Sequence, residues 1–242
     1  FDIHGGGSDL LFPHHENEIA QSEAATGTRF ANVWMHNGPL RVDNEKMSKS
    51  LNNFFTVRDV LKSYDAEVVR HLLIASHYRS PINYSEQGLK QSASVLERFY
   101  NALKGLDIAN AKSLTNSRFE KAFFEAMDDD FNTPEAFSVL FEMVKEINRQ
   151  KAADSNVANQ LGALLVRLAN TLGILQSSAE DFLRNNVSTD VDAEAIEQLI
   201  AAREQARADK DWAKADEIRD KLSEMKVVVE DGAMGSGWRI ER

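Results

Sequence analysis

The chain has 242 residues, of which 43% are hydrophobic and 27% are charged, proportions typical of a globular protein with one large domain or two smaller ones. Its 28 Lys and Arg residues are outnumbered by 38 Asp and Glu residues, so the net charge is −10. This balance argues against unspecific coating of nucleic acid or adhesion to anionic membranes, because both need a positive field. A folded nucleic-acid partner bound at a few chosen places stays possible.

Neither a membrane span nor a secretion signal is expected. No window of about 18 apolar residues is present, and the opening residues, Phe1 to Gly5, lack a basic stretch and a signal-peptide core. The sequence has no cysteine and therefore offers no disulfide and no thiolate ligand. We expect a cytoplasmic protein, or a piece of one that begins as if in the middle of a strand.

The first ninety residues have the pattern of mixed strands and helices. A strand at 1–4 is expected to stop at a glycine run, a helix to start near Pro13, and short strands to follow at 32–38 and 40–43. Thr56, with an acid three positions later, predicts a capped helix start. All six histidines of the chain lie in this part, at positions 4, 14, 15, 36, 71 and 77. Acid–base or metal chemistry is therefore expected here.

The rest of the chain is helical in pattern until its last residues. Apolar stripes at helical spacing predict an antiparallel bundle over 91–187, whose last long helix closes at Gly173. The acidic run at 128–130 is interpreted as a solvated turn before a helix, in preference to a metal site. Residues 176–192 have the composition of a linker, and 188–242 predict two helices around Trp212 and a β-hairpin.

A loop with two lysines follows the short strands. Lys46 and Lys49, three residues apart and flanked by small hydroxyls, can bind a polyphosphate with mobile point charges. The full string from Lys46 to Ser50 resembles the KMSKS signature of class I aminoacyl-tRNA synthetases. This resemblance implies that the loop closes on ATP and stabilises phosphate charge during amino-acid adenylation. Asn52 stands where the family usually has Gly, and loop closure is expected to survive because Asn tolerates left-handed backbone.

The opening residues narrow the resemblance to one family. The strings His4-Gly5-Gly6-Gly7-Ser8-Asp9 and Phe12-Pro13-His14-His15-Glu16-Asn17-Glu18 resemble the cysteinyl-tRNA synthetases, and the likeness extends over essentially the whole chain. A glycine run after a strand lets backbone approach a nucleotide. The resemblance implies that Gly7 and Asp9 bind ATP, with Asp9 accepting from two ribose hydroxyls, and that His4 lies at the substrate as a catalytic residue. A glycine turn with a capping Asp, and a structural histidine, are the alternatives.

His14 and Glu18 are four residues apart on an expected helix, so they share one face. A nitrogen and an oxygen from one face suit zinc, although such a pair is more often a surface hydrogen bond. The resemblance implies that both are zinc ligands and that two cysteines encoded before Phe1 complete the site. A borderline-soft metal separates cysteine from serine by its preference for sulfur, which an apolar pocket does poorly. His15 begins no HExxH motif, because the residue four positions later is Ile19.

Two further elements imply contact with tRNA. Asp65-Ala66 with Arg70 matches the family's Asp-Ala-x-x-x-Arg element, which joins the catalytic core to the anticodon-binding bundle, although an ordinary helix ion pair is an alternative for Arg70. Trp212 offers an aromatic face for an unpaired base, with Arg and Asp side chains nearby in sequence to read its edges. The expected anticodon readers are Arg207, Trp212, Asp216 and Asp231, and the alternative for Trp212 is a core position.

The predicted architecture is α/β followed by all-α, with a small α+β tail. By resemblance, residues 1–55 are the C-terminal part of a Rossmann-like nucleotide-binding catalytic domain, 56–90 are connecting helices, 91–187 are the anticodon-binding bundle, and 188–242 recognise the anticodon. The element that carries the family's HIGH nucleotide motif is absent. The chain alone is therefore expected to bind zinc weakly, if at all, and to form no adenylate.

The implied activity of the intact enzyme is that of a cysteine–tRNA ligase. It would use ATP with Mg²⁺ to make cysteinyl-adenylate, hold one zinc ion, act as a monomer away from membranes, and transfer cysteine to the 3′ end of tRNA(Cys). Two alternatives remain at this point. One is a ligase that joins cysteine to an amino sugar on the same catalytic core, and the other is a non-catalytic tRNA-binding module.

Overall fold

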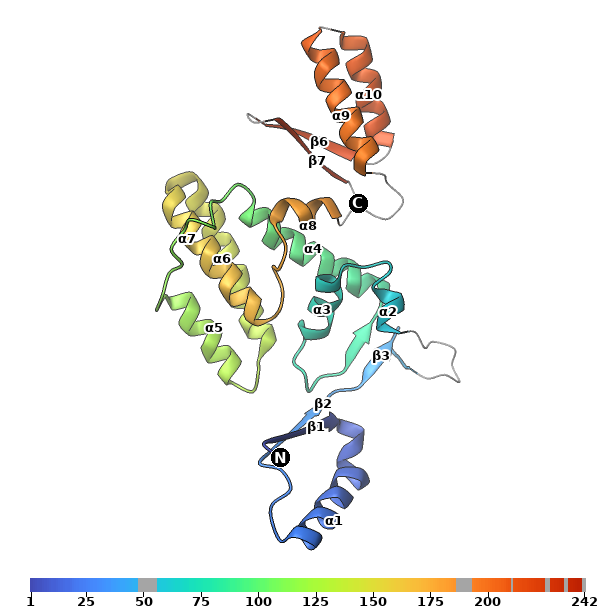
Figure 1. Cartoon of the computed structure of the whole chain (residues 1–242), viewed down its shortest axis with the longest axis vertical. Helices are drawn as coiled ribbons and strands as arrows, with labels where there is room; N and C mark the ends of the chain where they lie inside the picture. Colours follow the sequence, from blue (N-terminus) through green and yellow to red (C-terminus); the bar gives the residue numbers. More distant parts are fainter. Residues whose placement is uncertain (48–55, 186–192, 210, 225–226, 233–234, 241–242) are drawn as a thin grey trace. The chain divides into compact units, whose positions relative to one another are not determined.

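Figure 1 shows the computed structural model of the chain, which describes residues 1–47, 56–185, 193–209, 211–224, 227–232 and 235–240. The chain divides into two compact units, Phe1–Gln176 and Ser177–Arg242. No helix among the described residues is both long enough and apolar enough to cross a membrane.

A strand–helix–strand segment opens the first unit (Figure 1). β1 (Ile3–Gly7) pairs in parallel with β2 (Val33–Asn37), and α1 (Glu16–Thr26) lies between them in the chain. Two short turns of helix, η1 (Ser8–Leu10) and η2 (Leu11–His15), connect β1 to α1. Parallel strands need such a crossover connection, and here α1 is part of it, as in a βαβ unit.

The glycine run was expected to stop β1, but the strand continues through all three glycines. The strand continues because the three glycines pair with Met35, His36 and Asn37 of β2. A Cβ on Gly6 would lie 2.8 Å from Cε1 of His15. Glycine at this position therefore makes room for an imidazole against the strand. The α-helix also begins later than expected, at Glu16 instead of near Pro13.

A second sheet carries the lysine loop. β3 (Leu40–Val42) pairs antiparallel with β4 (Glu45–Lys46) and in parallel with β5 (Ile82–Tyr84). The turn between β3 and β4 has two residues at positive φ, Asp43 (47°) and Asn44 (68°), as a tight hairpin turn requires. The backbone N–H of Asn44 donates to Oδ1 of Asn83 at 2.7 Å, which fixes the turn to β5.

Two short helices follow. α2 (Val57–Val60) begins with the predicted capping pair: Thr56 Oγ1 accepts from the N–H of Asp59, whose carboxylate accepts from the N–H of Thr56. α3 (Ala66–Ile74) begins at Asp65, whose carboxylate accepts from the N–H of Glu67 at 2.7 Å. The predicted helix start at Thr56 is confirmed.

Four long helices complete the first unit and confirm the predicted bundle (Figure 1). Each begins at a polar side chain that accepts from a backbone N–H of its first turn. The helices are α4 (Glu86–Leu103), α5 (Arg118–Asp128), α6 (Thr133–Ala153) and α7 (Ser155–Thr171). Their core contains fully buried Leu96, Phe99, Phe123, Leu140 and Leu164, and Gly173 follows α7 with a φ of 70°.

The acidic turn between α5 and α6 is exposed, as expected, and its last acidic residue is also anchored. Asp130 accepts hydrogen bonds from the hydroxyl of Tyr78 at 2.7 Å and from Nε of Arg79 at 2.6 Å. These bonds hold the pKa of Asp130 down at about 2, with the Arg79 bond as the largest cause. The turn thus joins the bundle to the segment that follows α3.

The second unit has its own small core. It contains α8 (Ala179–Asn185), α9 (Ala193–Ala208), α10 (Trp212–Glu224) and a hairpin of β6 (Val227–Gly232) with β7 (Gly235–Ile240). Helix α8 lies within the stretch that was expected to be a linker. The core consists of residues from α9, α10 and β6, namely Ile196, Ile200, Ile218, Leu222 and Val227.

His71 of α3 gives the first unit a testable pH dependence. The side chain is 6% exposed, packs edge-on against Phe137 of α6, and has no partner for Nδ1 among the described residues. Burial lowers its pKa from 6.5 to about 4. Between these values the unfolded chain binds a proton that the folded chain does not, so stability falls as pH falls from 6.5 toward 4.

We expect the His71→Leu variant to lose this dependence. In urea titrations at pH 7 and pH 4.5, the free energy of unfolding of the wild type should fall by about 2 kcal/mol more than that of the variant. Equal losses for both proteins would show that His71 is not the titrating group.

Candidate active site

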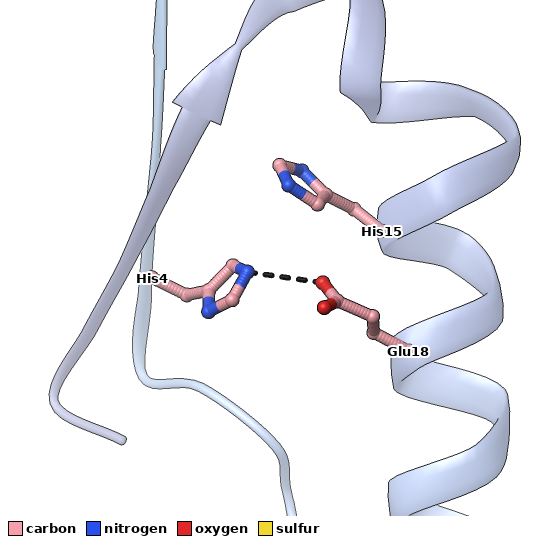
Figure 2. A group of neighbouring side chains, drawn as sticks. All are labelled: His4, His15 and Glu18. Atoms are coloured by element: carbon pink, nitrogen blue, oxygen red, sulfur yellow. Dashed lines mark ion pairs between the residues drawn. The ribbon is translucent and has the colours of Figure 1, made fainter.

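Glu18 is the centre of a cluster of histidines at the start of α1. Its Oε2 lies 3.0 Å from Nε2 of His4, and its Oε1 lies 3.5 Å from Nε2 of His14. His4 comes from β1 and faces the helix, and Figure 2 shows His4, His15 and Glu18 directed into the same space. One ligand atom from each of these three residues lies within 4.8 Å of the others.

The backbone explains why these side chains meet. Parallel pairing sets His4 opposite Trp34 and Gly6 opposite His36, so both strands present rings toward one place. The ring of Trp34 lies 4.8 Å from that of His4 and 5.1 Å from that of His15, measured between centroids. Because Gly6 has no side chain, His15 can approach the sheet.

His15 is buried and is held by a second histidine. Its Nδ1 lies 2.8 Å from Nε2 of His36, so one of these two nitrogens donates to the other. Burial lowers the pKa of His15, and the neighbouring His36 lowers it further. His15 is therefore neutral at pH 7, and a neutral imidazole keeps a lone pair that can bind a metal or accept a proton.

The donor set fits a zinc ion in part. Oε2 of Glu18 is buried and has no hydrogen-bond partner among the described residues, although His4 lies beside it at ion-pair distance. A buried carboxylate oxygen that makes no hydrogen bond is costly, and a cation bound beside His4 would compensate for the missing bond. Imidazole nitrogen and carboxylate oxygen are two of the three ligand types that zinc takes in proteins.

The residues expected to bind ATP are described unevenly. Gly7 ends β1, and Asp9 is exposed in the short turn η1 that follows. Of Lys46 only the backbone is described, as the last residue of β4. Lys49 lies outside the described residues.

The expected anticodon readers belong to the second unit. Trp212 is the first residue of α10 and is 62% exposed, so it is not a core residue of this unit. Asp216 is one turn further on the same helix and pairs with Arg219 at 2.9 Å, and Arg207 is exposed near the end of α9. Asp231 is described only as backbone in β6.

Three residues in or beside the cluster, His15, His36 and Trp34, were not predicted as site residues from the sequence. His15 was considered only as part of a protease motif, and neither His36 nor Trp34 was assigned a role. The confinement of all six histidines to the first third of the chain was the available signal. Only the parallel pairing of β1 with β2 shows which of them meet.

Comparison with known families accounts for most of the chain. Residues 1–94 match the family of class I (C) tRNA synthetase catalytic domains, residues 122–176 match the DALR domain, and residues 190–239 match the anticodon-binding domain of cysteinyl-tRNA ligases. The LeuRS of Agrobacterium radiobacter K84, solved in a ternary complex with tRNA and LeuAMS, shares the fold over 95% of this chain and 36% of its own, with a TM-score of 0.57 at 18% identity.

The fold and these domains define part of a class I aminoacyl-tRNA synthetase: a portion of the catalytic domain, then helical domains. The cysteine–tRNA ligases of Ectopseudomonas mendocina and Azotobacter vinelandii are 60% and 58% identical to it over 240 residues. The chain belongs to the cysteinyl-tRNA synthetase family. The two alignments include 99% of this chain and 52% of each relative. The chain therefore covers about half the length of the relatives it matches.

Proposed function

We propose that this chain is part of a cysteine–tRNA ligase that activates cysteine with ATP and transfers it to tRNA(Cys). The observation that supports this most strongly is 60% identity over 240 residues to a cysteine–tRNA ligase. The histidine and carboxylate cluster around Glu18 adds a chemical reason, because cysteine recognition needs a group that tells sulfur from oxygen.

The metal part of the proposal assigns zinc to Glu18 and His14, with His4 and His15 beside them. When bound, zinc supplies a borderline-soft Lewis acid that prefers the cysteine thiolate to the serine hydroxyl. Glu18 contributes a negative charge that helps to retain the ion. The pair of His15 with His36 holds one imidazole in a fixed orientation, as hydrogen-bonded histidines do around metal sites.

The nucleotide part of the proposal assigns ATP binding to Asp9, which follows β1, and to the two lysines of the loop. Lys46 and Lys49 neutralise the phosphates of ATP, which is bound with Mg²⁺, while the cysteine carboxylate attacks the α-phosphate and pyrophosphate leaves. Asp9 accepts hydrogen bonds from the ribose hydroxyls. The product, cysteinyl-adenylate, then loses AMP when a hydroxyl of the terminal tRNA ribose attacks its carbonyl carbon.

The tRNA part assigns anticodon recognition to Arg207, Trp212, Asp216 and Asp231 of the second unit. In the full-length protein, Trp212→Ala should weaken tRNA(Cys) binding by about ten-fold, because stacking one base on an aromatic ring contributes ~1–3 kcal/mol. Trp212→Phe, which keeps an aromatic face, should retain most of the affinity. Filter binding measures both variants, and wild-type affinity in Trp212→Ala would exclude Trp212 as a stacking residue.

The match of residues 190–239 to an anticodon-binding domain favours tRNA over an amino sugar as the acceptor. The test is to incubate the full-length protein with ATP, Mg²⁺, cysteine and either a tRNA(Cys) transcript or an amino sugar. We expect cysteine to become attached to the tRNA alone. Consumption of ATP that depends on the amino sugar, without charging of tRNA, would contradict the proposal.

A further inference from the structure

Glu67 is a buried carboxylate that holds the end of the helical bundle. It lies in the first turn of α3 and is 8% exposed. The hydroxyl of Tyr100 lies 3.0 Å from both of its oxygens. The backbone N–H groups of Leu175 and Gln176 donate to Oε2 and Oε1, each at 2.8 Å. The carboxylate is therefore satisfied by three donors, two of which come from consecutive residues more than a hundred positions away.

The chain must adopt an unfavourable conformation to present these two amides. Leu175 has a φ of 59°, a left-handed conformation that costs free energy for any residue with a side chain. Consecutive N–H groups directed at one point form an anion-binding concavity, and the Glu67 carboxylate occupies it. A charge-assisted hydrogen bond is about twice as strong as a neutral one, so this anion can hold the strained turn.

Arg70, one turn further along α3, binds the same segment. Its Nε donates to the carbonyl oxygen of Leu172 at 2.6 Å. A Cβ on Gly173 would collide with the guanidinium group, so glycine at this position leaves space for Arg70. Two side chains on one face of α3, the carboxylate of Glu67 and the guanidinium of Arg70, therefore bind the backbone of residues 172–176.

The contact between α3 and residues 172–176 connects two of the matched domains at the end of the first unit. Glu67 and Arg70 lie in the segment that matches the catalytic domain, and residues 172–176 are the last of the segment that matches the DALR domain. The second unit begins at the next residue, Ser177. A catalytic-domain helix therefore fixes the residues from which the chain continues to the proposed anticodon readers.

We propose that Glu67 is a positioning residue for tRNA, acting through the amides of Leu175 and Gln176. This role rests on the proposed function, since it requires the second unit to bind tRNA. Holding the exit of the first unit reduces the conformations that the second unit samples, so tRNA binding loses less entropy. Glu67 contacts Tyr100, Leu175 and Gln176, which lie outside the cluster around Glu18, so we expect amino-acid activation not to depend on Glu67.

The test compares Glu67→Gln with Tyr100→Phe in the full-length protein. An amide has the size of the carboxylate but no charge, and it can no longer accept from all three donors. Amide hydrogen exchange at Leu175 and Gln176 should be about 10- to 100-fold faster in Glu67→Gln, the factor expected for losing a charged hydrogen bond. The KM for tRNA(Cys) should rise about ten-fold, while the kcat of cysteine-dependent ATP–pyrophosphate exchange stays at the wild-type value.

Tyr100→Phe is the matched control, because it removes one donor and leaves both amide bonds to Glu67. It should change neither the exchange of the two amides nor the KM for tRNA. An equal effect of both variants, or unchanged amide exchange in Glu67→Gln, would overturn the proposal. If Glu67→Gln does not fold, Glu67→Asp can replace it, because its side chain is one methylene shorter and places the carboxylate further from the two amides. Glu67→Asp should give smaller increases in amide exchange and in the KM for tRNA(Cys).

The two proposals fail in different ways. If wild-type protein does not charge tRNA, the proposed function is wrong, and the amide exchange still reports whether Glu67 holds the turn. If wild-type protein charges tRNA and the amides of Glu67→Gln exchange faster with no change in the KM for tRNA, the positioning role alone is wrong.

Discussion

In the full-length protein, Glu18→Gln is expected to lower cysteine-dependent ATP–pyrophosphate exchange by about 100-fold or more. The change removes the only carboxylate of the described cluster and leaves a neutral amide, which is a weak zinc ligand. Loss of an outer-shell partner typically costs 10–100-fold in metal affinity or activity, and loss of a ligand should cost at least as much. Metal analysis after dialysis should show less than one zinc per chain.

Glu16→Gln is the matched control for this substitution. Glu16 is the first residue of the same helix and is exposed, so the same chemical change is made two residues before Glu18 on a side chain directed to solvent. It should leave both zinc content and exchange rate unchanged. Wild-type zinc content and activity in Glu18→Gln would contradict the assignment of Glu18 as a ligand.

The second large effect is expected from the lysine loop. Lys49→Ala should lower the rate of adenylate formation by about 10²–10³-fold, the typical cost of losing one preorganised group that stabilises charge in the transition state. Single-turnover measurements should show this loss in the chemical step, with the affinity for cysteine nearly unchanged, because the lysine acts on phosphate.

Lys62→Ala is the control for Lys49→Ala. Lys62 is an exposed lysine close in sequence, and it pairs with Asp59 at 2.8 Å outside the loop. Its removal should change the rate by less than about two-fold, as expected for a surface ion pair. A rate in Lys49→Ala equal to that of Lys62→Ala would exclude a phosphate-binding role for the loop lysine.

The local signals in the sequence predicted local structure well. Thr56 with Asp59 predicted a capped helix, and Gly173 predicted the end of one, because each effect depends on backbone groups within a few residues. The bundle was also predictable, since an apolar stripe at helical spacing can be buried in few other ways. The helix α8 was not predicted, because its seven residues are too few to show an apolar stripe and they lie in a polar stretch.

The candidate site was only half predictable. The spacing of His14 and Glu18 places them on one face, but the approach of His4 depends on strand pairing across thirty residues. The glycine run is expected to leave space for a nucleotide, and that stays a prediction. Nothing in the sequence indicated that Gly6 also makes space for His15. No rule of spacing connects Glu67 with Leu175, because that contact is made by the tertiary fold alone.

The measurement that tests the central claim most directly is X-ray absorption at the zinc edge of the full-length protein, with and without cysteine. The claim is that a metal ion held by Glu18 and His14 binds the sulfur of the substrate. For the free full-length protein we predict nitrogen or oxygen ligands at ~2.0–2.1 Å together with the sulfur ligands of the two upstream cysteines at ~2.3 Å. Adding cysteine should increase the number of sulfur ligands at ~2.3 Å by one, and adding serine should change nothing. An identical spectrum with and without cysteine, or a protein that contains no zinc, would contradict the account.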